Sequence, residues 1–248
     1  MRTTALAAAL FAGAALVVGL VAPTATSASS AHSYAFDPMT HNGTAVAVSR
    51  VHGYNQNGYN WSGYVATGSG FSSVSTTWTE PSAKCSSTND LYAPWVGIDG
   101  YGSNSVEQTG VQTDCSSGSP VDSAWYEVYP ANPVYYSNAV GAGDVITATV
   151  TRSGTSYTMT LNDKTKNWTK TTTKSYNGAN ASAEVILESP TAAYPNFGTV
   201  SFTGSTVNGK SLSSYNPTAF DASNNSGQYE DHTGALSGGN FSVTYERQ

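Results

Sequence analysis

Hydrophobic and polar residues alternate through much of the chain from Trp61 onward. In residues 144–151, Ile146, Ala148 and Val150 share one face, and the threonines lie mostly on the other. The same alternation recurs, in part or in full, in residues 71–78, 156–161 and 241–245. A period of two predicts half-buried β-strands, and no window shows the stripe of an amphipathic helix.

Turn-forming residues separate these stretches at short intervals. Gly, Asn and Ser mark the turns, and the Thr, Val and Tyr between them favour a pleated, half-buried surface. Many short strands predict an all-β fold: a sandwich of two antiparallel sheets, of the concanavalin-like or jelly-roll type. No interior linker or repeat is evident, so we expect a single domain over residues 58–248.

The first 57 residues have a different character. Arg2 precedes an apolar run over residues 5–22, and a stretch of small residues follows it. This order predicts a secretory signal peptide over residues 1–28 rather than an uncleaved membrane anchor. Residues 29–57 are polar and irregular, and we interpret them as a propeptide or a flexible N-terminal arm. We therefore expect a secreted, extracellular protein that does not bind a membrane after signal cleavage.

Composition narrows the choice of partners. The 248 residues include 10 Lys and Arg against 16 Asp and Glu, which gives a formal net charge of −6. Nucleic-acid binding needs a basic surface, so we expect no nucleic-acid partner. We also expect a monomeric protein. Export permits a disulfide between Cys85 and Cys115, the two cysteines of the chain, and two buried free thiols are the alternative.

Several common catalytic chemistries lack their sequence signatures. There is no His-Glu-x-x-His, no Gly-x-Ser-x-Gly with a downstream His, and no Gly-rich phosphate loop. No cluster has the spacing of metal ligands, so we expect no metal and no cofactor. What remains is a set of acids and amides inside apolar, aromatic strands, in residues 94–110, 124–130 and 183–190. Burying an unpaired carboxylate costs several kcal/mol, so these acids are candidate functional residues.

These segments carry a series of motifs in a fixed order. They are Trp95-Val-Gly-Ile-Asp-Gly100, Gln108-Thr-Gly110, Trp125-Tyr-Glu-x-Tyr-Pro130 and Ala183-Glu-x-Ile-x-Glu188. Together with Asn60-Trp-Ser-Gly63 they resemble the glutamic peptidases, also called eqolisins, and the resemblance spans residues 60–245. It implies a sandwich of two seven-stranded sheets and acid endopeptidase activity on polypeptide substrates.

The same resemblance implies a role for each matched residue. Gln108 and Glu188 match the catalytic dyad, in which the Glu is the general base for water and the Gln orients that water and donates to the oxyanion. The positions that line or support the substrate cleft are matched by Trp95, Asp99, Trp125, Glu127 and Tyr129. A side-chain amide keeps its donors at every pH, and Glu ionises near pH ~4.3, so the pair suits an acidic medium.

Two positions depart from the family pattern. Ser123 stands where the family often has an Asp, and Asp122 comes one residue earlier. This puts one supporting hydrogen bond in question. Glu107 stands before Gln108 where the family has an apolar residue, and it either adds a charge near the site or points to the other face of its strand. The sequence leaves the roles of Glu107 and Glu184 open.

A different class of protein is compatible with the same acids. A secreted glycoside hydrolase would use Glu127 and Glu188 as its acid and nucleophile, beside a sugar-stacking aromatic. A carbohydrate-binding β-sandwich would use the aromatic residues as a platform. Both would tolerate the loss of Gln108 better than a Gln/Glu peptidase could.

Overall fold

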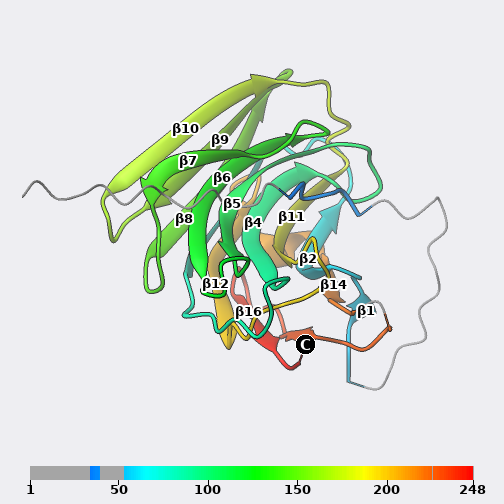
Figure 1. The fold of residues 1–248 in the computed structure, drawn as a ribbon. Coiled ribbons are helices and arrows are strands. Elements are labelled where there is room, and N and C mark those ends of the chain that lie inside the picture. The colour runs from blue at the N-terminus through cyan, green and yellow to red at the C-terminus, as the bar shows by residue number, and fades with distance from the viewer. Residues whose placement is uncertain (1–33, 40–52, 225, 248) are drawn as a thin grey trace, which may run out of the picture.

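A computed structural model describes residues 34–39, 53–224 and 226–247. Within these ranges the chain folds into two stacked β-sheets and one short 3-10 helix, η1 (Leu212–Tyr215) (Figure 1). The predicted all-β sandwich is therefore confirmed. The predicted signal peptide lies outside the described residues, and in the described part no helix is long and apolar enough to cross a membrane.

The first sheet presents the candidate site. In spatial order its strands are β1 (Gln56–Asn57), β14 (Thr218–Asp221), β2 (Trp61–Thr67), β11 (Ser182–Glu188), β4 (Leu91–Asp99), β5 (Val106–Asp114), β6 (Val121–Tyr129) and β7 (Val134–Ala139). Neighbouring strands are antiparallel except for the short β1, which pairs with β14 in parallel.

The second sheet backs the first. Its strands, in spatial order, are β10 (Trp168–Ser175), β9 (Ser156–Asp163), β8 (Val145–Ser153), β3 (Ser73–Thr79), β12 (Thr199–Val207), β16 (Phe241–Tyr245) and β15 (Asp231–Thr233). The short β13 (Lys210–Ser211) pairs with β12 beside this path. The resemblance implied seven strands in each sheet. The described residues form eight in each, and the two-residue strands β1 and β13 are among them.

The central strands of the first sheet are buried on both faces. On β4, Tyr92, Val96 and Ile98 pack between the sheets, whereas Leu91 and Trp95 belong to a second apolar cluster. Successive side chains of a strand point to opposite faces, so this second cluster lies on the outer face of the first sheet. We call it the outer cluster. Its other buried members are Phe36, Met39, Trp61, Val65, Ala93, Val106, Trp125, Ile186 and Phe220.

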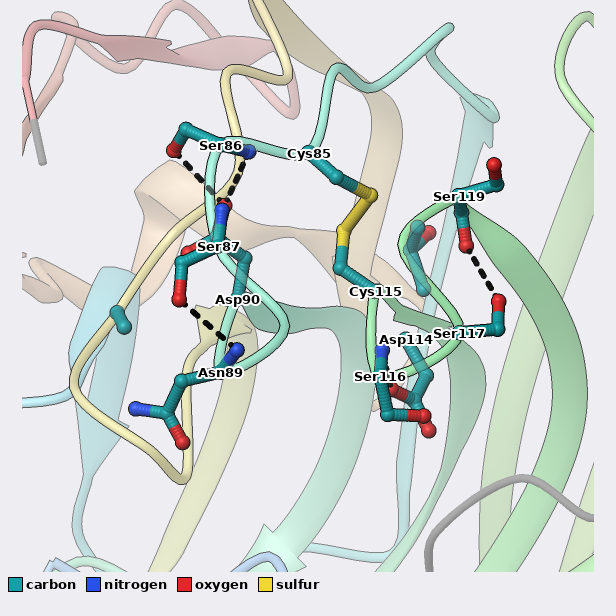
Figure 2. Close-up of a disulfide and its surroundings, with 12 residues drawn as sticks. Cys85, Ser86, Ser87, Asn89, Asp90, Asp114, Cys115, Ser116, Ser117 and Ser119 are labelled. Atoms are coloured by element: carbon teal, nitrogen blue, oxygen red, sulfur yellow. Dashed lines mark hydrogen bonds between the residues drawn. A yellow bond between two sulfur atoms is a disulfide. The ribbon is translucent and has the colours of Figure 1, made fainter.

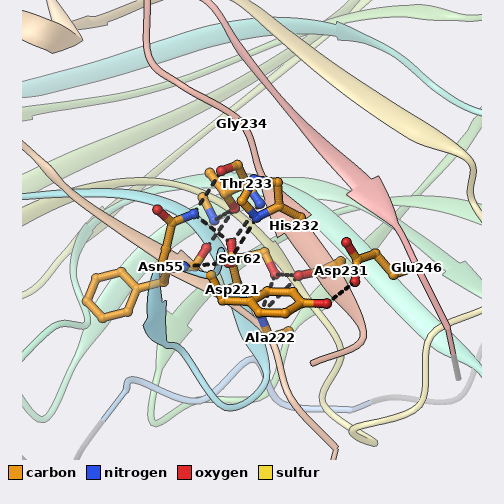
Figure 3. A network of polar contacts seen from close by, with 12 residues as sticks. Asn55, Ser62, Asp221, Ala222, Asp231, His232, Thr233, Gly234 and Glu246 are labelled. Carbon is orange, nitrogen blue, oxygen red and sulfur yellow. Dashed lines mark hydrogen bonds and ion pairs between the residues drawn. The ribbon is translucent and has the colours of Figure 1, made fainter. Parts of the chain in front are cut away.

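A polar network at the edge joins the two sheets (Figure 3). The hydroxyl of Ser62 on β2 donates to Asp231 on β15 at 2.5 Å, and the backbone N–H of Ala222 donates to the same oxygen at 3.0 Å. Burial raises the pKa of Asp231 to about 8. Beside it, Asp221 accepts hydrogen bonds from Asn55 and forms an ion pair with the imidazole of His232 if the ring is protonated.

The two cysteines form a disulfide, which settles the alternative left open by the sequence (Figure 2). Cys85 and Cys115 are 30 positions apart, and their Cα atoms are 5.7 Å apart. The bond joins the loop before β4 to the residue that follows β5. The carboxylate of Asp90 holds the same loop because it accepts hydrogen bonds from the backbone N–H groups of Ser86 and Ser87.

Candidate active site

The candidate catalytic residues come from separate strands of the first sheet. Gln108 on β5 lies directly opposite Glu127 on β6, and Gly97 on β4 lies opposite Gln108 on its other side. Glu188 ends β11, the neighbour of β4. Alternation along each strand places these side chains on the face of the outer cluster.

An amide and a carboxyl group meet at the centre of this face. Gln108 Nε2 donates to Glu127 Oε2 at 2.8 Å, and both side chains are fully buried. Burial raises the pKa of Glu127 to about 8, although the donors on this carboxyl act in the opposite direction. The hydrogen bond fixes the orientation of the amide, so that the donors of Gln108 point in a defined direction.

Glu188 is held by a donor on each of its carboxyl oxygens. Trp95 Nε1 donates to Oε2 at 3.0 Å, and Asn60 Nδ2 donates to Oε1 at 2.9 Å. Burial and the nearby carboxyl of Glu127 raise the pKa of Glu188 well above its usual range, while Trp95 and Trp61 lower it. The ring of Trp61 meets that of Trp95 edge to face, with centroids 5.0 Å apart. The tryptophans thus form part of the support of this carboxyl.

Two strand glycines make room for Trp95. A Cβ atom at Gly110 would lie 2.3 Å from the carbonyl oxygen of Pro94 and 2.7 Å from Cβ of Trp95. A Cβ atom at Gly97 would lie 2.9 Å from the indole ring of Trp95 and 3.3 Å from Cβ of Gln108. Glycine at both positions therefore lets the indole lie close to the sheet, where its N–H reaches Glu188.

A short piece of the N-terminal region lies on this face. Residues 34–39, drawn in blue in Figure 1, contribute Phe36 and Met39 to the outer cluster. The ring of Phe36 stacks on that of Trp125, with centroids 4.2 Å apart and an interplanar angle of 7°. Gln108 Nε2 donates to the carbonyl oxygen of Phe36 at 2.8 Å, and the N–H of Phe36 donates to Glu127 Oε2 at 3.2 Å. The central amide and carboxyl are both bonded to this segment.

The remaining predicted site residues occupy two places. Tyr129 packs against the outer cluster, and the charge of Asp37 is the largest cause that raises its pKa. Asp99 instead accepts hydrogen bonds from the backbone N–H groups of Asn180 and Ala181, at 2.9 and 3.0 Å. Its carboxylate therefore supports the loop that leads into β11.

The positions that the sequence left open now have a location. Glu107 adjoins Gln108 along β5, so alternation points it to the other face, between the sheets, where its carboxyl lies with the hydroxyl of Tyr157 beside Gly178. Asp122 also points between the sheets, where it accepts a hydrogen bond from Thr113 at 2.7 Å, and so it does not take the place of the Asp missing at position 123. Glu184 is fully buried. It lies two residues before Ile186 on β11, and therefore on the same outer face.

Sequence reasoning did not assign two contributors to this face. Asn60 belongs to a motif that was recognised, yet its hydrogen bond to Glu188 at 2.9 Å joins positions 128 residues apart and depends on the pairing of β2 with β11. Phe36 belongs to the polar, irregular stretch, where no periodic pattern marked it. Its single signal is its aromatic side chain, in a stretch without a periodic pattern. No group of three or more possible metal ligands occurs among the described residues.

A β-sandwich with an amide, two carboxyl groups and tryptophans on one sheet face is the arrangement that the resemblance to the glutamic peptidases implies. Comparison with known proteins agrees. The sequence pattern of the Peptidase A4 family matches residues 59–245, and the chain belongs to this family. It is therefore a glutamic-type peptidase, a hydrolase of peptide bonds.

Individual relatives are more distant. The chain is 28% identical over 219 residues to aspergillopepsin-2 of Aspergillus niger, covering 75% of this chain and 77% of that protein. It is 29% identical to scytalido-glutamic peptidase bound to a transition state analog inhibitor, with a TM-score of 0.67, and the match covers 76% of this chain and 98% of the other. It is 28% identical, with a TM-score of 0.63, to SCP-B, an eqolisin solved with the tripeptide Ala-Ile-His, with the same coverage.

Proposed function

We propose that this chain is an acid endopeptidase that uses Gln108 and Glu188 as its catalytic dyad. One observation carries the proposal. The amide of Gln108 lies 2.8 Å from a peptide carbonyl oxygen, on the face where donors hold the carboxyl of Glu188. A donor placed on a peptide carbonyl is what an oxyanion needs as it develops during amide hydrolysis.

In the proposed mechanism, Glu188 first acts as a general base. It takes a proton from water as the water oxygen attacks the peptide carbonyl carbon, and it later gives that proton to the leaving nitrogen. The amide N–H of Gln108 stabilises the negative charge on the carbonyl oxygen. Gln108 Oε1 is buried without a hydrogen-bond partner among the described residues, and it is the acceptor that orients the attacking water.

Glu127 is a positioning residue in this scheme. Its Oε2 accepts one N–H of Gln108 and leaves the other for the peptide carbonyl, so the amide cannot rotate freely. With a pKa of about 8, Glu127 is neutral in an acidic medium. A neutral Glu127 removes one of the charges that raise the pKa of Glu188, which favours the ionised Glu188 that the first step needs.

The test is hydrolysis of denatured casein between pH 2 and pH 8. Wild type is compared with Glu188→Gln and Gln108→Ala. Glu246→Gln serves as a matched control, because this partly exposed acid contacts Tyr54 and Arg247 rather than the dyad. We expect acid-side activity in the wild type and the control, and almost none in the other two. Circular dichroism of each variant shows whether it is folded. Near-full activity of a folded Gln108→Ala variant would refute the dyad.

We further propose that the protein acts outside the cell on polypeptides. Support comes from the N-terminal sequence pattern, from the disulfide between Cys85 and Cys115, and from the family to which the chain belongs. Detection of the processed protein in culture medium of the producing cells tests this point. Retention of the whole product inside the cells would contradict it.

A further inference from the structure

We propose that the peptide bond between Phe36 and Asp37 is cleaved by the chain's own site, and that Trp125 forms a subsite for the aromatic residue before the cleaved bond. This inference rests on the proposed function and goes beyond it. It assigns a processing site within the N-terminal region and a class of substrate, namely polypeptides with an aromatic side chain on the N-terminal side of the bond that is cut.

Phe36 has the contacts of a bound substrate residue. Its ring is fully buried and lies flat on Trp125, and Gln108 donates to its carbonyl oxygen. Its backbone N–H donates to Glu127, so both polar groups of its backbone are bonded to side chains of the site. Phe36 therefore places its ring on the aromatic subsite and its carbonyl oxygen on the oxyanion donor at the same time.

The residues after Phe36 continue over the same face. The hydrogen bonds of Phe36 place the Phe36–Asp37 bond beside Gln108 and Glu127, and the charge of Asp37 is among the causes that raise the pKa values of Glu127 and Glu188. Met39 then pairs in parallel with Tyr101, the second residue after β4. The segment is thus held by contacts on both sides of the Phe36–Asp37 peptide bond, as an extended substrate of an endopeptidase would be.

A backbone turn builds the second anchor. Asp99 and Gly100 have φ angles of 68° and 110°, which turn the chain back after β4. A Cβ atom at Gly100 would lie 3.1 Å from the ring of Trp61, so glycine permits this approach. The ring of Tyr101 then lies 5.5 Å from that of Phe220, a member of the outer cluster. The segment after the bond therefore pairs with backbone that the fold holds over the site.

The proposed step is an ordinary hydrolysis. The oxygen of one water bonds to the carbonyl carbon of Phe36, and Glu188 takes one proton of that water. The bond from this carbon to the nitrogen of Asp37 then breaks, and the nitrogen receives the proton. The products are a new carboxyl group at Phe36 and a new amino group at Asp37, so water is the only co-reactant.

The first experiment follows the exported chain itself. Protein purified at neutral pH is moved to the pH of highest activity on casein, and intact mass and N-terminal sequencing are followed with time. We expect a new N-terminus at Asp37 in the wild type and in Phe36→Tyr. The rate should fall about tenfold or more in Phe36→Ala, because the buried stacked ring is lost. Glu188→Gln should stay intact. A rate that does not change on dilution shows cleavage within one molecule.

Casein added to the same samples separates the two proposals. If casein is hydrolysed while the Phe36–Asp37 bond stays intact, the processing site is refuted and the proposed function stands. If neither casein nor the bond is cleaved in folded wild type, both are refuted.

A synthetic peptide tests the subsite without changing the protein. The peptide Tyr-Ala-Phe-Asp-Pro-Met copies residues 34–39, and a matched peptide has Ala in place of Phe. We expect the processed enzyme to cut the first peptide between Phe and Asp, with kcat/KM about tenfold or more above that for the second. Equal values for the two peptides would refute the aromatic subsite. Inhibition of casein hydrolysis by a peptide that stays uncut would show that the segment is an inhibitor and overturn the inference.

Discussion

Replacing Asp231 by Asn should flatten the loss of stability that we expect as the pH rises. In the fold, Oδ1 of Asp231 accepts from Ser62 and Ala222, while Oδ2 is buried without a partner among the described residues. A neutral acid fits this arrangement, with its proton on Oδ2. An Asn with its amide oxygen at the Oδ1 position has the same shape and the same acceptor, and it cannot ionise.

The magnitude follows from the pKa shift. Burial raises the pKa of Asp231 from 3.8 to about 8, so between these values the folded protein binds one proton that the unfolded chain does not. Because the folded-state pKa is the higher one, this contribution to stability is complete below about pH 4 and is lost as the pH rises through about 8. The slope is about −1.4 kcal/mol per pH unit for one proton, or roughly 3 kcal/mol between pH 5 and pH 7.

The assay is urea unfolding followed by tryptophan fluorescence at pH 5, 6 and 7. Both proteins carry Glu188→Gln so that self-digestion does not interfere. We expect the free energy of unfolding of Asp231→Asn to fall less steeply with pH than that of its parent, by about 1.4 kcal/mol per unit. Glu246→Gln, at a partly exposed acid, should keep the parent's slope. Equal slopes for the parent and Asp231→Asn would show that Asp231 is already ionised in the fold, and would refute the reasoning.

Three further perturbations test the support of the site and of the fold. Asn60→Ala should lower kcat on casein about tenfold or more and move the acid limb upward in pH, because a donor to ionised Glu188 is lost; an unchanged pH–rate profile would contradict this. Gly110→Ala should lower the melting temperature and the activity together, because its Cβ would lie 2.3 Å from a carbonyl oxygen of β4, whereas Gly141→Ala should leave both nearly unchanged. Cys85→Ser should cost roughly 4 kcal/mol of stability for a loop of this length, and an equal loss on reduction of the wild type checks it.

Local patterns were sufficient to predict the class of fold. The alternation in residues 144–151 and 241–245 became β8 and β16, because side chains of period two place one face on the core. The pairing of strands was not predictable in the same way. β2 lies between β14 and β11, which follow it by more than 110 residues. Such neighbours are set by packing of whole faces, and no local signal encodes them.

The site was predictable only as a set of residue types. The motifs identified Gln108, Glu127 and Glu188, and the structure places Gln108 against Glu127 in register. What the sequence could not give is which acid is ionised, because that depends on the donors around each carboxyl. It also could not indicate that Phe36 would lie on Trp125, because the segment that carries it has no periodic pattern.

The distribution of donors distinguishes the acids that the sequence presents as equivalent. Asp231 and Glu127 each receive two hydrogen bonds on one oxygen and none on the other among the described residues, so the free oxygen can carry a proton. Glu188 receives one N–H on each oxygen, and neither an indole nor an amide N–H can accept a proton in return. Both donors therefore favour the ionised form of Glu188, against the burial that raises its pKa. Among these three acids, Glu188 is thus the one with a donor to hold each oxygen in the ionised form, which is the form that the proposed mechanism needs, while Asp231 and Glu127, each with a pKa of about 8, stay neutral in acid.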